Sequence, residues 1–156
     1  MTMRRKVVSV IIAMLALSAL TAPPAGAQTA KALIDPNEAV ESELAQLPNM
    51  TPAIARSMVE KRPFKTIIEL HKFLLDQKFN VAQAKDFYGK AFVKINLNTG
   101  TKEEFLLIPG VGSRMSMELQ EYRPWKTWTQ FDKEIGKYVG QQEADRLKQY
   151  VFIPPS

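Results

Sequence analysis

Apolar residues recur at helical spacing along most of the chain, and capping residues mark where the helices begin. In the second half of the sequence, Thr101 stands three residues before Glu104, which predicts a capping box at the start of a helix. This helix carries apolar residues from Phe105 to Ile108, and Pro109 is expected to stop it. Strand patterning is nearly absent, so the pattern predicts an all-α fold.

A tight turn and a second helix are expected next. Gly110, Val111 and Gly112 predict a hairpin, because glycine adopts a positive φ and lets two backbones approach closely. The second helix runs from Ser113 to about Tyr122. It ends there because an Arg-Pro pair follows, and the residue before a proline disfavours the helical region.

Two more helices complete this half of the sequence. Thr127 and Gln130 predict another capping box, and a last helix is expected from about Gln142 to Tyr150. The only strand candidate is the stretch 92–95, which we interpret as an extended joint between two halves of the chain.

The sequence repeats itself at an offset of 61 residues. Residues 34–72 align without a gap on residues 95–133, and the alignment resumes after a one-residue deletion. The first copy has similar helix boundaries, with a stop at Pro48, a cap at Thr51 and a capping box at Thr66 and Glu69. We therefore expect two copies of one small helical unit, preceded by a leader and a short linker: residues 1–27, 28–33, 34–93 and 94–156.

The first 27 residues have the pattern of a secretory signal peptide. Arg4, Arg5 and Lys6 precede an apolar run, and a small-x-small site follows with cleavage expected after Ala27. An uncleaved anchor is the alternative, but the apolar run is shorter than the roughly 20 residues of a spanning helix. We therefore expect a periplasmic or secreted protein with no transmembrane span in its mature part.

The charge balance and the cysteine count limit which ligands and bonds the mature chain can have. Three of the 21 basic residues lie in the signal peptide, which leaves 18 against 16 acidic residues. The two copies hold eight basic and eight acidic side chains each, so only a local cluster of cations could attract nucleic acid. The sequence has no cysteine, which excludes disulfides and thiolate metal sites.

The residues from Ile95 to Gly112, followed by Tyr122-Arg123 and an aromatic-Lys-Thr sequence, resemble the helix-hairpin-helix domain of the competence DNA receptors. They are also similar to the extrinsic subunit U of cyanobacterial photosystem II, which shares that fold and serves as a protein-binding lumenal subunit. The resemblance is strong over residues 95–153 and reaches residues 34–93 mainly through the duplication. It implies two tandem helix-hairpin-helix units packed into a compact helical domain.

The resemblance also implies a DNA site. In the DNA-binding version, hairpin amides and the start of the second helix face a phosphate, and no base is read. Here a hydroxyl and a cation follow the hairpin, and lysines further along the chain add positive charge. The expected nucleic-acid-binding residues are Gly110, Val111, Gly112, Ser113, Arg114, Lys126 and Lys133, with Lys137 as a further candidate cation.

Other interpretations of the same residues stay open. The Gly-Val-Gly segment can simply be the tight turn that the fold requires, with Val111 filling the gap between helices. In that case we expect a protein-interaction or scaffold subunit of a membrane-associated complex. The near-zero net charge of each copy favours this alternative. The first hairpin is expected to bind no phosphate, because Thr51 can cap its own helix and Pro52 lacks an N–H group.

No enzyme, metal site, cofactor or small-molecule substrate is expected. The single histidine, His71, has no cysteine partner, and Ser113 lies outside a nucleophile-elbow pattern. Trp125 and Trp128 could form a stacking platform for single strands. The apolar residues at the matching positions of the first copy favour core packing for both, whereas an exposed tryptophan would favour a partner surface.

Overall fold

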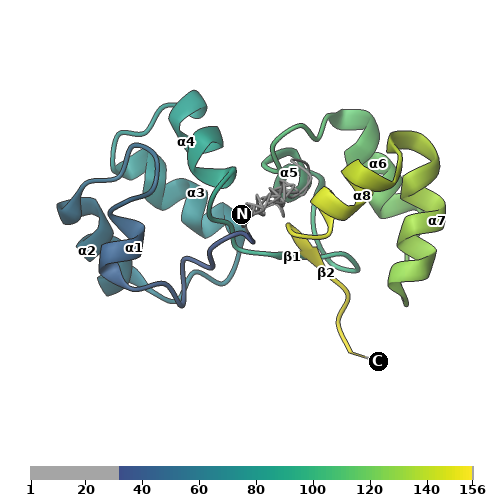
Figure 1. Ribbon diagram of the computed structural model, residues 1–156, viewed down its shortest axis with the longest axis horizontal. Helices are drawn as coiled ribbons and strands as arrows, with labels where there is room; N and C mark the ends of the chain where they lie inside the picture. The colour runs from purple at the N-terminus through teal and green to yellow at the C-terminus, as the bar shows by residue number, and fades with distance from the viewer. Residues whose placement is uncertain (1–31, 156) are drawn as a thin grey trace, which may run out of the picture. The chain divides into compact units, whose positions relative to one another are not determined.

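The computed structural model of the chain describes residues 32–155 (Figure 1). The expected signal peptide, its cleavage site and most of the linker lie outside the described residues. Within residues 32–155, no helix has the length and apolar character that a bilayer crossing requires.

The described part is mostly helical, as the sequence predicted, with two short strands. The helices pack in consecutive pairs, α1 with α2, α3 with α4, α5 with α6 and α7 with α8. The elements, in chain order, are α1 (Glu41–Leu44), α2 (Pro52–Lys61), α3 (Ile67–Asp76), α4 (Val81–Tyr88), β1 (Ile95–Asn96), α5 (Lys102–Leu106), α6 (Ser113–Glu121), α7 (Trp128–Val139), α8 (Gln141–Leu147) and β2 (Val151–Phe152).

The capping residues begin the helices that the sequence assigned to them. The hydroxyl of Thr101 accepts from the amide of Glu104 at 3.2 Å, and the Glu104 carboxylate accepts from the Thr101 amide at 2.8 Å, so this capping box is confirmed. Thr127 also caps its helix, but the Gln130 side chain accepts from the amide of Lys126 rather than from Thr127. The box expected there is therefore only half formed.

The first copy shows the same departure from a full capping box. Thr66 accepts from the amide of Glu69, whereas the Glu69 carboxylate accepts from the amide of Lys65 at 2.7 Å. In both copies the returning side chain thus bonds the residue just before the cap, which fixes the approach of the loop to the helix.

Two helices are shorter than expected. Helix α5 ends at Leu106, and the amide of Ile108 bonds the carbonyl of Phe105 three residues back, which tightens the chain before Pro109 is reached. Helix α8 ends at Leu147 rather than at Tyr150.

The two strands form a parallel pair that the sequence did not predict. Ile95 of β1 lies opposite Val151 of β2, at the end of the stretch interpreted as a joint. A single parallel bridge between Ile34 and Ala91 occupies the corresponding place in the first copy. In each copy the chain entering the unit therefore pairs with the chain leaving it.

A half-buried arginine contact also recurs at the 61-residue offset. Arg62 donates to the carbonyl of Ala39 at 2.5 Å, and Arg123 donates to the carbonyl of Gly100. Gly100 has no room for a side chain, because an added Cβ would lie 2.4 Å from the side chain of Ile95. This close approach explains why glycine stands there.

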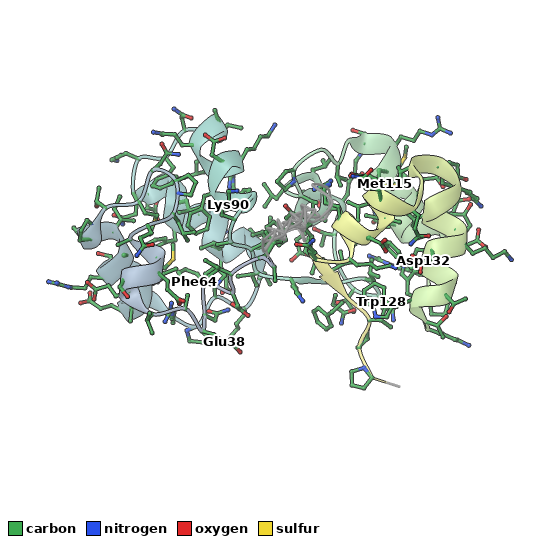
Figure 2. All side chains as sticks on the ribbon, in the orientation of Figure 1. Glu38, Phe64, Lys90, Met115, Trp128 and Asp132 are labelled. Atoms are coloured by element: carbon green, nitrogen blue, oxygen red, sulfur yellow. The ribbon has the colours of Figure 1, made fainter. Side chains whose placement is uncertain are left out.

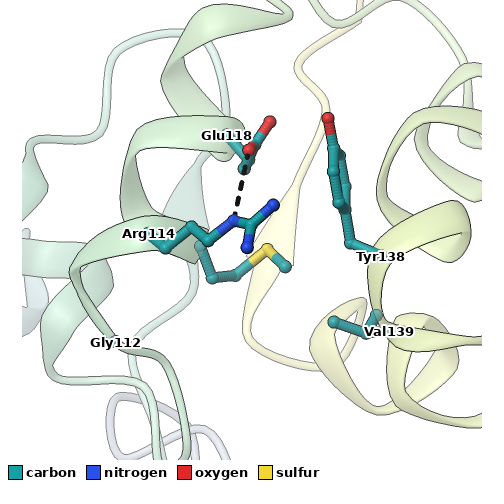
Figure 3. Close-up of a pocket in the computed structure, with 6 residues that line it drawn as sticks. Gly112, Arg114, Glu118, Tyr138 and Val139 are labelled. Carbon is teal, nitrogen blue, oxygen red and sulfur yellow. Dashed lines mark ion pairs between the residues drawn. The ribbon is translucent and has the colours of Figure 1, made fainter.

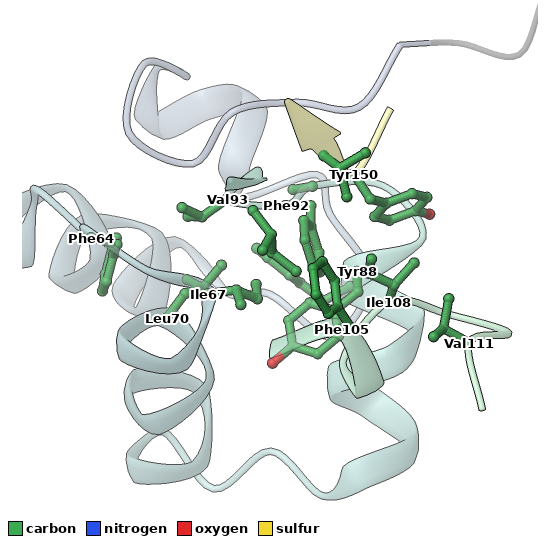
Figure 4. Close-up of a cluster of buried hydrophobic side chains, with 14 of the residues drawn as sticks. Phe64, Ile67, Leu70, Tyr88, Phe92, Val93, Phe105, Ile108, Val111 and Tyr150 are labelled. Atoms are coloured by element: carbon green, nitrogen blue, oxygen red, sulfur yellow. The ribbon is translucent and has the colours of Figure 1, made fainter. Parts of the chain in front are cut away.

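Figure 2 shows the side chains of the described residues in the orientation of Figure 1. Aromatic side chains connect the two copies in one hydrophobic core (Figure 4). Tyr88 and Phe92 meet edge to face with ring centroids 5.6 Å apart, and Phe92 meets Tyr150 in the same way at 4.9 Å. Because Tyr150 belongs to the second copy, these contacts pack α4 of the first copy against the segment after α8. The core therefore extends across the repeat boundary.

Candidate nucleic-acid interface

Residues 110–112, between α5 and α6, form a glycine hairpin with one buried side chain, that of Val111. Gly110 adopts a φ of +84°, in the left-handed region that favours glycine. Val111 is buried, and its amide donates to the carbonyl of Ile108 at 3.0 Å, which closes the turn. Val111 therefore fills the gap between the helices, as one interpretation of the sequence expected, and its own amide is occupied.

The next three amides are arranged differently. Gly112 is the N-cap of α6 in an extended conformation, and no side chain caps this helix. Among residues 32–155, no group accepts a hydrogen bond from the amides of Gly112, Ser113 or Arg114. All three residues are exposed, and the space where a Gly112 side chain would stand is open. Uncapped N–H groups at a helix start favour an anion.

The first hairpin leaves fewer amides available at the start of its second helix. The hydroxyl of Thr51 accepts from the amide of Ile54 at 3.2 Å, and Pro52 is the first residue of α2. The cap expected at Thr51 is confirmed. Asn49 takes the left-handed conformation, φ +62°, that Gly110 adopts in the second hairpin. The two hairpins thus share a backbone turn but differ in the amides that they leave available.

A small cavity adjoins the second hairpin (Figure 3). It has a volume of about 320 Å³ and lies between the start of α6 and the end of α7. Arg114 and Glu118 line it from α6, and Tyr138 and Val139 line it from α7, together with Gly112 and Met115. Tyr138 was not predicted from the sequence, because it meets Arg114 of α6 only through the folding of α7 beside that helix.

Arg114 is the cation nearest the uncapped amides in sequence, and it reaches into this cavity. Its side chain is 81% exposed, and its Nε lies 3.9 Å from Oε1 of Glu118. Its guanidinium also lies over the ring of Tyr138, 5.7 Å from the centroid. The Glu118 carboxylate partly offsets the positive charge of Arg114.

Lys137 stands among the groups at the end of α7. Its Nζ contacts the hydroxyl of Tyr122 at 2.9 Å and Oε2 of Glu134 at 2.7 Å. Hydrogen bonding to Glu134 raises the pKa of Lys137, and hydrogen bonding to the Tyr122 hydroxyl raises the pKa of Tyr138 to about 12. Both side chains therefore keep their protons at neutral pH.

The two lysines of the expected site do not line the hairpin cavity. Lys133 is on α7 with Nζ 3.7 Å from Oε1 of Glu134. Lys126 precedes α7, whose 12 residues span about 18 Å, and it is the other end of this helix that lines the hairpin cavity. The structure thus brings Gly110 to Arg114 together and does not place Lys126 beside them.

No protein-family model matches this chain, and no curated protein or solved structure matches it either.

The two tryptophans have different environments. Trp125 is 1% exposed, and its indole N–H donates to the carbonyl of Leu119, so the core placement is confirmed for this residue. Trp128 is 38% exposed and meets Phe131 edge to face at 5.7 Å, so the core placement is wrong for this one. Its counterpart in the first copy, Ile67, is buried.

The remaining candidate chemistry is sparse. His71 is half-buried, with Nδ1 2.7 Å from the hydroxyl of Tyr88, and burial lowers the pKa of its imidazole. Within the described residues, no group of three or more His, Asp or Glu side chains could hold a metal ion.

Proposed function

We propose that this chain is an exported, non-enzymatic protein of two tandem helix-hairpin-helix units that binds DNA without sequence specificity. The observation that carries the proposal is the uncapped, exposed start of α6, where the amides of Gly112, Ser113 and Arg114 have no acceptor among residues 32–155. A backbone phosphate of DNA supplies such an acceptor, and the helix dipole favours its negative charge.

The surroundings support a phosphate contact of modest strength. Arg114 is exposed and adds a cation beside the amides, while the missing side chain of Gly112 lets a phosphate approach the backbone. The carboxylate of Glu118, on the next turn of α6, weakens the attraction of this site for a phosphate. With one such hairpin, the affinity for duplex DNA should fall with log salt at a slope of roughly −0.9 to −1.8, which corresponds to one or two phosphates.

The test is a binding titration of the processed chain with a blunt DNA duplex at several salt concentrations. Gly112→Asp adds a carboxylate where the phosphate is expected, and the backbone at this N-cap accepts a side chain without strain. Because aspartate is a good N-cap, helix content should be unchanged, while DNA binding should be lost.

The first hairpin offers a matched control. Thr51→Asp places the same carboxylate at the corresponding N-cap of α2, so its effect on net charge is the same. We expect DNA affinity to change less than about two-fold, since the amide of Ile54 is already capped there. Absence of binding by the unmodified chain at low salt would overturn the proposal.

A protein-interaction or scaffold role is the second candidate function. The exposed indole of Trp128 and the near-neutral charge of both copies favour it. If the chain fails to bind DNA at low salt, Trp128→Ala should then weaken its association with a membrane-associated complex, measured by co-sedimentation with the membrane fraction.

A further inference from the structure

Arg146, on α8, contacts the second hairpin from a part of the chain remote in sequence. Its Nη2 donates to the carbonyl of Pro109 at 2.7 Å, across a separation of 37 residues. This carbonyl belongs to the peptide group that leads into Gly110, the residue with φ +84°. The hydrogen bond therefore restrains the peptide plane at the point where the chain turns.

The guanidinium of Arg146 is itself held in place. Its Nε and Nη2 donate to the two carboxylate oxygens of Glu143 at 2.7 and 2.6 Å, a bidentate pair. The same group lies over the ring of Tyr150, 5.3 Å from the centroid. Three contacts thus fix a side chain whose remaining polar partner is the hairpin carbonyl.

Gly110 makes the approach of this side chain possible. A Cβ at that position would lie 3.3 Å from Nη2 of Arg146, tighter than most such contacts. The glycine therefore serves both the turn and the close approach of the guanidinium.

The first copy has no equivalent contact. The residue that aligns with Arg146 is Asp86, which cannot donate to a carbonyl when ionised. Instead, Nε2 of Gln83 on α4 donates a long hydrogen bond, 3.5 Å, to Oδ1 of Asn49 at that hairpin. The arginine contact thus accompanies the hairpin whose amides are uncapped and is missing at the one whose helix is capped by Thr51.

We propose that Arg146 is a positioning residue for the second hairpin. By holding the Pro109 carbonyl, it fixes the turn closed by the amide of Val111 and so aims the following amides of α6 outward. It acts on the backbone and does not contact the phosphate. The effect of Arg146 on DNA binding rests on the proposed function. Its effect on the hairpin conformation can be measured without DNA.

The first experiment measures amide hydrogen exchange in the processed chain without DNA. Arg146→Met removes the donor and keeps an apolar stem over Tyr150, so exchange at Val111 should accelerate by roughly ten-fold, consistent with loss of a charge-assisted hydrogen bond. Exchange at Leu119, in the interior of α6, should stay within about two-fold. Lys148→Met is the matched control, because Lys148 carries the same charge at the end of α8 and pairs with Asp132 and Asp145 instead.

The second experiment compares how the DNA affinities of the unmodified chain and the Arg146→Met variant depend on salt concentration. Arg146→Met should weaken duplex binding by roughly ten-fold at every salt concentration and leave the slope unchanged, because no phosphate contact is lost. A slope reduced by about 0.9 would show that Arg146 contacts a phosphate, and it would overturn the positioning role. Unchanged exchange at Val111 would also overturn it. If the unmodified chain does not bind DNA, the proposed function fails while the exchange result still decides the role of Arg146.

For a second variant, Glu143→Gln, the two possible roles of Arg146 predict opposite changes in DNA affinity. Glu143→Gln removes an acidic group, which would strengthen DNA binding if Arg146 met the phosphate directly. Because Glu143 anchors the guanidinium, positioning requires the opposite result, weaker binding with faster exchange at Val111. Stronger binding by Glu143→Gln would refute the inference.

Discussion

The side chain of Asn98 holds both backbone polar groups of Trp125. Its Nδ2 donates to the Trp125 carbonyl at 2.9 Å, and its Oδ1 accepts from the Trp125 amide at 2.6 Å. At the 61-residue offset, Asn37 makes the same two bonds with Phe64, at 3.0 and 2.8 Å. In each copy this asparagine therefore joins the segment before the first helix to the segment before the third.

Replacing Asn98 with alanine should destabilise the protein by about 2 to 3 kcal/mol, because two partly buried hydrogen bonds are lost and two backbone groups lose their partners. Chemical denaturation measures the free energy of unfolding. Asn37→Ala is the matched variant and should cost a similar amount. A loss below about 0.5 kcal/mol for either variant would contradict the importance of this contact.

The two tryptophans should differ sharply in their effect on stability. Trp125→Ala removes a buried indole and its hydrogen bond to Leu119, so the expected loss is about 3 to 5 kcal/mol. Trp128→Ala removes a side chain that is more than one third exposed, and its cost should be below about 1.5 kcal/mol. Thermal unfolding of both variants checks the order, and equal losses would contradict the environments described above.

Arg114 and Lys126 should differ in how much each contributes to the salt dependence of DNA binding. Arg114→Ala should reduce the slope of DNA affinity against log salt by about 0.9 in magnitude, the value for one phosphate contact. Lys126→Ala removes the same charge at the far end of α7 and should leave the slope unchanged. An equal reduction in both variants would indicate a broad basic surface rather than a hairpin site.

Stability should fall as the pH drops through the titration of His71. Burial lowers the pKa of this imidazole below its ordinary 6.5, so the unfolded chain binds the proton more readily than the folded one. The contribution of neutral His71 is therefore complete above about pH 6.5 and declines as the pH falls toward the folded-state value. Unfolding measured between pH 5 and 8 should show this decline, and His71→Gln should flatten it.

Helix starts were predictable because their signals are local. Thr101 and Thr127 cap the helices that follow them, and Thr51 caps α2, since a hydroxyl reaches an amide only three residues away. The sequence predicted that Glu69 and Gln130 would accept from the amides of the capping threonines, but each accepts from the residue before. The direction of the entering loop decides which amide points at the side chain.

The sequence by itself determined the helical class of the described residues, the caps and the contrast between the two hairpins, because each depends on neighbours along the chain. Only the tertiary structure decided the pairing of β1 with β2, the exposure of Trp128 and the contact of Arg146 with Pro109. These features join residues that are far apart in sequence, and no local pattern records which distant group will pack against them.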